Sequence, residues 1–298
     1  MTKFHNLSLV LTSDITLELI YVPAGEFLMG SNPTVDPNAT GHELPQHKMF
    51  LDAFYIGKAP VTVAQFAAFV NATGHKTTAE QYGHGYHLVK NQWETIEGAH
   101  WRNSLGGESI VQQKRNHPVT LVSWYDASAF CDWVTRLTHH HVELPSEAEW
   151  ERAARGIGGF IYPWGNDKPT DKLCNYNSNI KDTSPVGQYS PQGDSPIGCS
   201  DMAGNVIEWT RSLWGRDINA PEYPYPYSKG KNERENIQGP EDVRRVVRGG
   251  AWDDDSESVR SAYRFSNPPI SRNNLQGFRV ASFGLLSSND PLEAKRAG

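Results

Sequence analysis

Cysteine is scarce in this sequence of 298 residues: only Cys131, Cys174 and Cys199 occur, an odd number without Cys-x-x-Cys spacing. A disulfide framework and a zinc ribbon are therefore not expected. Positive charge is also in short supply, because 28 Lys and Arg face 34 Asp and Glu, for a formal net charge of −6. A general nucleic-acid-binding protein carries a basic excess, so we expect no nucleic-acid partner.

Long hydrophobic runs are missing as well. No apolar stretch approaches the ~20 residues needed to cross a bilayer, so membrane insertion is not expected. The first residues contain one Lys and a short, broken apolar segment. They lack the apolar region and small-residue cleavage site of a signal peptide. With the sparse cysteines, this pattern predicts a cytoplasmic protein.

Turn-forming and aromatic residues are plentiful. The chain has 26 Gly and 19 Pro, together with nine Trp, twelve Tyr and eleven Phe. Gly and Pro favour turns and irregular backbone, whereas the rings bury large surfaces per residue. This composition predicts a loop-rich α+β fold rather than a helical bundle.

Local patterns predict several strands and helices. Residues 15–22 and 25–30 alternate apolar and polar side chains around Pro23, which predicts two strands in an opening hairpin. The aromatic segment 49–56 predicts a further strand.

Three helices have clear starting signals. Thr62 precedes an apolar stripe that ends at Gly74, whereas Ser123 and Ser146 each open a capping box. We predict helices after Thr62, Ser123 and Ser146, the last of which ends at Gly156.

The domain organisation follows from what lies between these elements. Segments 75–116 and 215–242 show no clear period and are predicted to be surface insertions. No linker divides the chain, so we expect a single domain over residues 1–284. Residues 285–298 have little to bury and are predicted to form a flexible tail.

Seven motifs follow one another along the chain. They are Val22–Gly30, Phe54–Gly57 with Pro60–Thr62, His117–Val119 with Val122–Trp124, Leu144–Trp150, Pro163–Asn166, Asp201–Asn205 with Glu208 and Trp209, and Arg248–Gly250 through Gly277–Arg279. In this order the motifs resemble the formylglycine-generating enzyme family, also called sulfatase-modifying factors. The resemblance implies a formylglycine-generating-enzyme-type α+β fold with a C-type-lectin-like core and little regular secondary structure.

That family's best-known chemistry is not expected here. Members that oxidise a sulfatase cysteine keep a reactive cysteine pair between the Gly-Gly and Gly-Phe-Arg motifs, but residues 249–279 contain no cysteine. Copper(I) needs soft thiolate ligands, so no copper is expected and cysteine-to-formylglycine oxidation is excluded. Related scaffolds also serve iron-dependent sulfoxide synthases and the variable proteins of diversity-generating retroelements, so the fold alone does not decide the function.

The window between these motifs predicts a binding surface over residues 251–276. Its side chains mix rings, amides and acids, as binding surfaces do. The candidate ligand-binding residues are Asp253, Asp254, Asp255, Glu257, Tyr263, Phe265, Asn267, Ile270, Ser271, Asn273, Asn274 and Leu275. We expect a non-catalytic module that binds a protein or surface ligand here, in a segment that retroelement diversification is able to vary. The alternative is a metal-dependent oxidoreductase with a non-cysteine site.

Two features of this window have more ordinary interpretations. Trp252 is predicted to belong to the core. The acidic run Asp253–Asp255 is predicted to be a solvated ridge, neutralised by Arg260, Arg264 and Arg272.

Calcium is the expected cofactor, in a structural role. Asn205, Glu208 and the carbonyl of Val206 offer the hard oxygen ligands that Ca²⁺ prefers, and the resemblance implies a calcium site at this motif. Asn175 and Asp182 resemble a second such site. The alternative is a turn stabilised by Asn205, with Glu208 paired to an arginine.

The histidines give no clear metal signal. His139–His141 follow a predicted helix and are interpreted as exposed helix-end residues. His84, His87 and His100 match no known ligand spacing.

Overall fold

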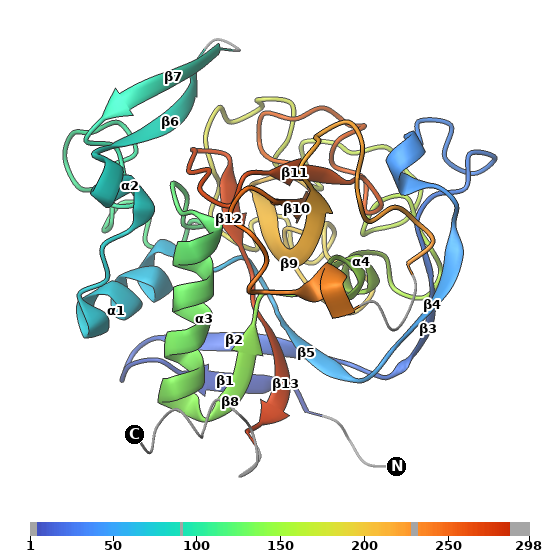
Figure 1. Cartoon of the computed structure of the whole chain (residues 1–298), viewed down its shortest axis with the longest axis horizontal. Coiled ribbons are helices and arrows are strands. Elements are labelled where there is room, and N and C mark those ends of the chain that lie inside the picture. Colours follow the sequence, from blue (N-terminus) through green and yellow to red (C-terminus); the bar gives the residue numbers. More distant parts are fainter. Residues whose placement is uncertain (1–4, 90–91, 228–231, 287–298) are drawn as a thin grey trace.

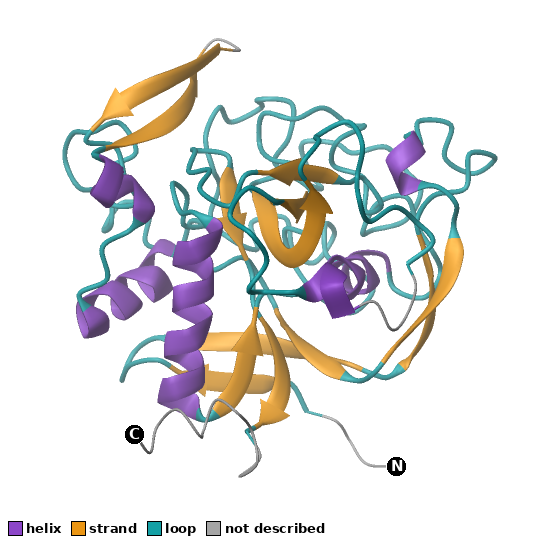
Figure 2. Ribbon diagram, in the orientation of Figure 1, coloured by secondary structure: helices purple, strands orange, loops and turns teal. Residues whose placement is uncertain are grey.

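The computed structural model describes residues 5–89, 92–227 and 232–286. Two sheets organise this part of the chain, and long loops cover much of the surface (Figures 1 and 2). The first sheet has the order β1-β2-β5-β13-β8. Its strands are β1 (Leu7–Val10), β2 (Thr16–Val22), β5 (Phe54–Gly57), β8 (His140–Glu143) and β13 (Ala281–Leu285).

The second sheet carries the last motifs of the chain, Arg248–Gly250 and Gly277–Arg279, and positions the candidate site. Its order is β11-β10-β9-β12, and β12 runs parallel to β9. The strands are β9 (Ile207–Gly215), β10 (Arg244–Arg248), β11 (Phe265–Asn267) and β12 (Gln276–Phe278).

The predicted opening hairpin is wrong, although its two strands exist. β2 pairs with β1 and β5, whereas β3 (Gly25–Met29) pairs with β4 (His47–Leu51) in a separate two-stranded sheet. The predicted single strand 49–56 is also wrong, because its residues are divided between β4 and β5, which pair with different strands. Strand pairing depends on distant partners, which the local alternation does not reveal.

The predicted helices are present with their caps. α1 (Val63–Thr73) begins after Thr62 and ends at Gly74 with φ 68°, in the left-handed region that glycine tolerates. α3 (Trp124–Thr138) and α4 (Glu147–Arg155) each begin with a capping box, at Ser123 and Ser146. Reciprocal side-chain bonds to the first-turn N–H groups explain why these short motifs predicted the starts well.

The segment 75–116 has more regular structure than its composition suggested. It contains α2 (Thr78–Tyr82) and a hairpin of β6 (His84–Val89) and β7 (Gln92–Glu97), which stands out from the rest of the molecule (Figure 1). The described part of 215–242 is mainly loop and contains the short 3₁₀ helix η2 (Asn232–Glu235) (Figure 2). A second 3₁₀ helix, η1 (Gly41–Glu43), lies between β3 and β4. Most of the predicted tail, residues 287–298, lies outside the described residues.

The core is built around aromatic rings. Trp124, Trp150, Trp209 and Trp252 are buried, as predicted for Trp252. The packing is extended by edge-to-face contacts between Phe66, Phe69, Phe130 and Phe278. No helix among the described residues has the length and apolar character needed to span a membrane.

Helix α4 is the electrostatic centre of the fold. Glu147 and Glu151 are fully buried and accept hydrogen bonds from Arg264 and Arg248 at 2.6–2.9 Å. Burial raises the pKa of Glu147, but Arg264, Arg234 and Arg248 together lower it below its ordinary value. Arg248 and Arg264 therefore tie the last third of the chain to the Leu144–Trp150 motif.

Candidate functional site

A groove of about 540 Å³ is the main candidate site. It lies where the β6–β7 hairpin meets the second sheet and the segment 251–276. Its lining residues are Tyr86, Trp93, Ile207, Ile218, Arg244, Asp254, Tyr263, Phe265, Asn267, Ser271, Asn273 and Leu275. Mostly apolar walls with a few polar groups are typical of binding sites of this volume.

Much of the predicted binding surface meets in this groove. Of the candidate residues, it is lined by Asp254, Tyr263, Phe265, Asn267, Ser271, Asn273 and Leu275. The remaining candidates, which do not line it, are Asp253, Asp255, Glu257, Ile270 and Asn274. The structure thus brings together the rings and amides of the window more than its acids.

Strand alternation explains which residues face the groove. In the segment 263–267, which includes β11, the side chains of Tyr263, Phe265 and Asn267 are partly or fully exposed. Those of Arg264 and Ser266 are buried. Successive side chains of an extended segment point to opposite faces. Every second residue is therefore available to a ligand.

The β6–β7 hairpin contributes a wall that the sequence did not predict. Its base is fixed to the window by backbone hydrogen bonds from Tyr86 N–H to the Arg272 carbonyl (3.1 Å) and from Asn274 N–H to the Tyr86 carbonyl (3.1 Å). Arg272 also stacks over the rings of Tyr82 and Tyr86. Trp93, 53% exposed, belongs to the same wall. In the sequence, only the isolated position of Trp93 within a polar segment could have indicated that this hairpin contributes to a binding surface.

Three further lining residues were also missed. Ile207 and Arg244 begin β9 and β10, and Ile218 follows β9 in the loop 215–242. Each lies far in sequence from the window, so only strand pairing brings it to the groove.

Asp254 is the most perturbed acid at the groove. Its Oδ2 accepts a hydrogen bond from the Ala251 N–H at 2.8 Å. Burial, followed by the charges of Asp253 and Asp255, raises its pKa from 3.8 to about 6. Burial and the nearby Asp254 also raise the pKa of Tyr263. Near neutral pH, Asp254 is thus able to hold or release a proton inside the groove.

The other acids of the run are engaged in local bonds. Asp253 accepts a hydrogen bond from the Ser178 hydroxyl, and Asp255 accepts from the N–H groups of Glu257 and Ser258. Such bonds stabilise a turn.

The predicted neutralisation of these acids by nearby arginines is wrong. Arg260 binds Asp36 and Glu43, and Arg264 binds Glu147, with all of these side chains buried. Arg272 contacts the hairpin, as described above. Buried guanidinium groups need buried carboxylates, and for Arg260 and Arg264 these come from Asp36, Glu43 and Glu147 rather than from the acidic run.

The residues of the first predicted calcium site have other partners. Both carboxylate oxygens of Glu208 accept hydrogen bonds from Arg279, at 2.6 and 2.7 Å, and Trp150 donates a third at 2.8 Å. The amide of Asn205 bonds both backbone groups of Ser184. This is the alternative arrangement, a turn stabilised by Asn205 with Glu208 paired to an arginine.

The geometry around Asn205 explains two other motif positions. Asn205 has φ 65°, and at Gly204 (φ 72°) a Cβ atom would lie 2.1 Å from the Asn175 carbonyl oxygen. Val206 is buried directly beside them. The Asp201–Asn205 motif therefore describes a tight turn.

Asn175 and Asp182 do not turn their side chains toward each other. The amide of Asn175 donates to the backbone carbonyl of Asp182 at 2.9 Å, whereas the Asp182 carboxylate binds the Lys114 ammonium. Within the described residues, no group of three His, Cys, Asp or Glu side chains has the geometry of a metal site. Calcium at either position remains a prediction.

The three cysteines are buried and unpaired thiols. Burial raises the pKa of Cys174 to about 12 and that of Cys199 to about 11, and it also raises the pKa of Cys131. None of them lines the groove. They are poor nucleophiles and poor metal ligands at neutral pH.

The histidines also occupy structural positions. His139 caps α3, and His140 and His141 lie in β8. His84 Nε2 accepts a hydrogen bond from Arg272 at 2.8 Å, and His100 is half-buried in the segment after β7.

Fold and groove together define the class of protein: an α+β scaffold with sparse regular structure that presents a concave, aromatic-lined surface. Residues 12–283 match the family "Sulfatase-modifying factor enzyme 1-like domain". The chain is a member of this formylglycine-generating enzyme family, as its motifs predict.

Curated relatives include active and inactive proteins by name. A formylglycine-generating enzyme of Streptomyces coelicolor is 36% identical over 92% of each chain. An "Inactive C-alpha-formylglycine-generating enzyme 2" of Bos taurus is 30% identical over 90% of this chain and 88% of its own. The family is therefore established, but its members differ in activity.

Solved structures agree with the fold. PvdO from Pseudomonas aeruginosa has 28% identity and a TM-score of 0.69, covering 94% of this chain and 99% of its own. The Treponema denticola variable protein 1 has 20% identity and a TM-score of 0.64, covering 93% and 98%. The second likeness concerns the fold alone.

Proposed function

We propose that this chain is a non-catalytic binding module whose groove receives a segment of another protein. The observation that carries the proposal is the convergence of the predicted window with the hairpin on one aromatic-lined groove of about 540 Å³. Rings such as Tyr263 and Phe265 supply contact area at low entropic cost, and the amides of Asn267 and Asn273 supply adaptable hydrogen bonds.

The absence of thiols supports a binding role over cysteine oxidation. Residues 249–279 contain no cysteine, and the cysteines elsewhere are buried. The Bos taurus relative named as inactive provides a precedent within the family. We place the protein in the cytoplasm, where reduced, unpaired cysteines persist.

A photo-crosslinking residue at the groove tests the proposal. Benzoylphenylalanine in place of Phe265, which is 36% exposed, is expected to capture a discrete partner in cells that produce the protein. The matched control places the same residue at Phe50, which is 40% exposed on β4.

Competition then separates specific from incidental capture. Added unlabelled protein should abolish the Phe265 crosslink, whereas a folded triple variant Tyr263→Ala, Phe265→Ala, Leu275→Ala should not. Equal capture from both crosslinking positions, or equal competition by the triple variant, would refute the proposed face.

One observation favours a second candidate, a metal-dependent oxidoreductase with a non-cysteine site. Asp254 lines the groove with a pKa near 6, which suits proton transfer at neutral pH. Stoichiometric iron or copper in the purified protein, lost in Asp254→Asn, would support this function. Metal-free protein that still binds its partner would exclude it.

A further inference from the structure

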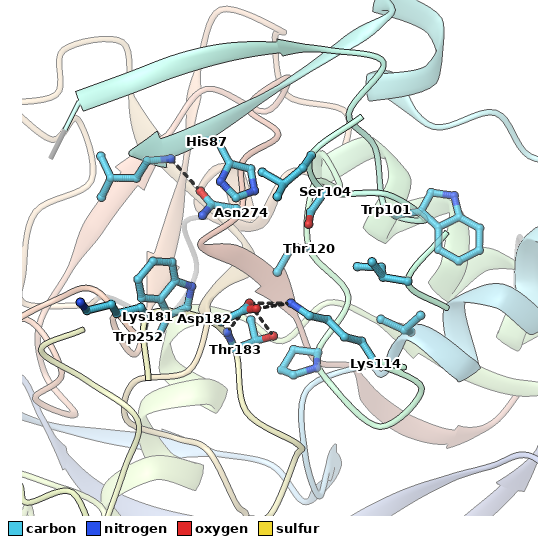
Figure 3. Close-up of a pocket in the computed structure, with 15 residues that line it drawn as sticks. His87, Trp101, Ser104, Lys114, Thr120, Lys181, Asp182, Thr183, Trp252 and Asn274 are labelled. Atoms are coloured by element: carbon cyan, nitrogen blue, oxygen red, sulfur yellow. Dashed lines mark hydrogen bonds and ion pairs between the residues drawn. The ribbon is translucent and has the colours of Figure 1, made fainter. Parts of the chain in front are cut away.

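A second, smaller cavity lies behind the wall of the groove. It has a volume of about 180 Å³ and is enclosed by the end of β6, residues 101–120 after β7, the loop 181–183, Trp252 and Asn274 (Figure 3). Its wall is shared, because Tyr86 and Asn273 line the groove, whereas their neighbours His87 and Asn274 line the cavity. The cavity is thus a separate compartment with its own chemistry.

Hydrogen-bond donors dominate the polar lining. Lys114 Nζ lies 2.6 Å from both carboxylate oxygens of Asp182, an ion pair that Figure 3 shows at the cavity. An ammonium group has three donors, so one N–H of Lys114 is left for another acceptor. The Asp182 side chain is 52% exposed and that of Lys114 is 22% exposed, so water screens the carboxylate more than the ammonium.

Three nitrogen atoms at the cavity have no hydrogen-bond partner within the described part of the chain: Trp252 Nε1, Trp101 Nε1 and His87 Nε2. The two tryptophan side chains are 6% and 2% exposed. An indole N–H can only donate, and a buried donor without an acceptor retains its desolvation penalty. The Trp252 indole, which Figure 3 shows beside Asp182, therefore favours an acceptor atom within the cavity.

His87 adds a neutral polar group. Burial and the charge of Lys114 lower its pKa, and the opposing effect of Asp182 does not compensate. It is neutral at pH 7 and able to donate or accept.

The remaining lining is mixed. Its apolar members are Val63, Leu88, Leu105, Ile110 and Pro118, and its polar members are Ser104, Thr120, Lys181, Thr183 and Asn274. At roughly 30 Å³ per water molecule, the volume equals about six waters or one short organic molecule. Apolar walls around a donor-rich end favour a ligand with one acceptor group and a hydrocarbon body.

We propose that this cavity binds a small organic carboxylate. Its oxygens accept hydrogen bonds from the Lys114 ammonium and the Trp252 indole N–H, while its hydrocarbon part packs against Leu88, Leu105 and Ile110. The site is independent of the partner proposed for the groove, since the two compartments use different side chains.

Calorimetric titration of the full chain with butyrate and benzoate tests the site, with butyramide and benzamide as neutral matches. We expect saturable binding of at least one acid, with its amide binding more weakly. Lys114→Met should weaken the acid roughly ten- to a hundredfold through loss of a charge-assisted bond. Lys172→Met, at an exposed position, should bind like the wild type.

Indole N–H signals in a ¹H–¹⁵N spectrum of the wild-type protein locate the bound acid, and this measurement does not depend on the folding of Lys114→Met. Trp252→Phe identifies one signal by its loss. The acid should shift the signal of Trp252 in the wild type, but not that of Trp214, whose indole donates to the Asp217 carbonyl at 3.0 Å. Failure of both acids to saturate, equal affinity for the amides, or unchanged affinity in Lys114→Met would each overturn the proposal and leave water as the occupant.

Discussion

Replacement of Arg279 by Met should be among the most damaging single changes in this protein. The Arg279 side chain is fully buried and bonds Glu208 twice, at 2.6 and 2.7 Å. It also donates to the backbone carbonyls of Gly57, Ser200 and Asp201, at 2.9–3.1 Å. Methionine keeps much of the chain length but provides no donor.

The magnitude follows from what the substitution leaves behind. Removal of one partner from a buried ion pair costs about 3–5 kcal/mol, because the other charge stays buried without compensation. The carbonyl groups that lose their donors add to that cost. We therefore expect the free energy of unfolding to fall by about 5 kcal/mol, against a total of about 5–15 kcal/mol for a typical protein. The melting temperature should fall by roughly 10 °C or more.

Urea unfolding followed by tryptophan fluorescence measures the change, and Arg216→Met is the matched control. Arg216 also bonds a carboxylate, that of Asp242 at 2.7 Å, but both side chains are more than half exposed. The control should unfold like the wild type. A double variant with Glu208→Gln should recover part of the loss, because it removes the stranded charge. If Arg279→Met and Arg216→Met had the same midpoint, the central place given to the buried pair would be wrong.

Other predictions concern pH, metal and thiols. Asp254 has a folded pKa of about 6 against an ordinary value of 3.8, so the folded state binds the extra proton and stability should decrease as pH rises from about 4 to 6. Asp254→Asn should remove this dependence and gain up to about 3 kcal/mol at pH 7, whereas an unchanged pH slope would contradict the assignment. The predicted calcium site implies that EDTA should lower the melting temperature, that added calcium should restore it, and that Asn205→Ala should abolish the effect; a melting temperature that EDTA leaves unchanged would refute the site. Cys131, Cys174 and Cys199 are buried, so a thiol reagent should label the native protein slowly and the urea-unfolded protein fully; rapid native labelling would disprove their burial.

The sequence predicted best the features that depend on nearby residues. The helix starts at Thr62, Ser123 and Ser146 are decided by side chains within one turn, so short motifs were sufficient. The hairpin predicted around Pro23 failed because the alternation of β2 and β3 does not specify their partners.

The same distinction applies to the groove. The window 251–276 is continuous, so its lining residues were found, but Trp93 and Arg244 reach the groove only through the fold. Arg260 and Arg264 were assigned to the nearest acids in sequence, whereas their partners Glu43 and Glu147 lie more than a hundred residues away. The number and order of charged residues in the sequence do not predict which distant acid each arginine will pair with.

The alternation along residues 263–267 also has a use in protein engineering. Arg264 and Ser266 face inward, where Arg264 anchors the chain to Glu147, while Tyr263, Phe265 and Asn267 face the groove. A library that randomises only the codons of these three outward positions would change the contact surface and leave the anchors intact. The fold would then serve as a scaffold for selecting new binders by display, with the inward codons held constant.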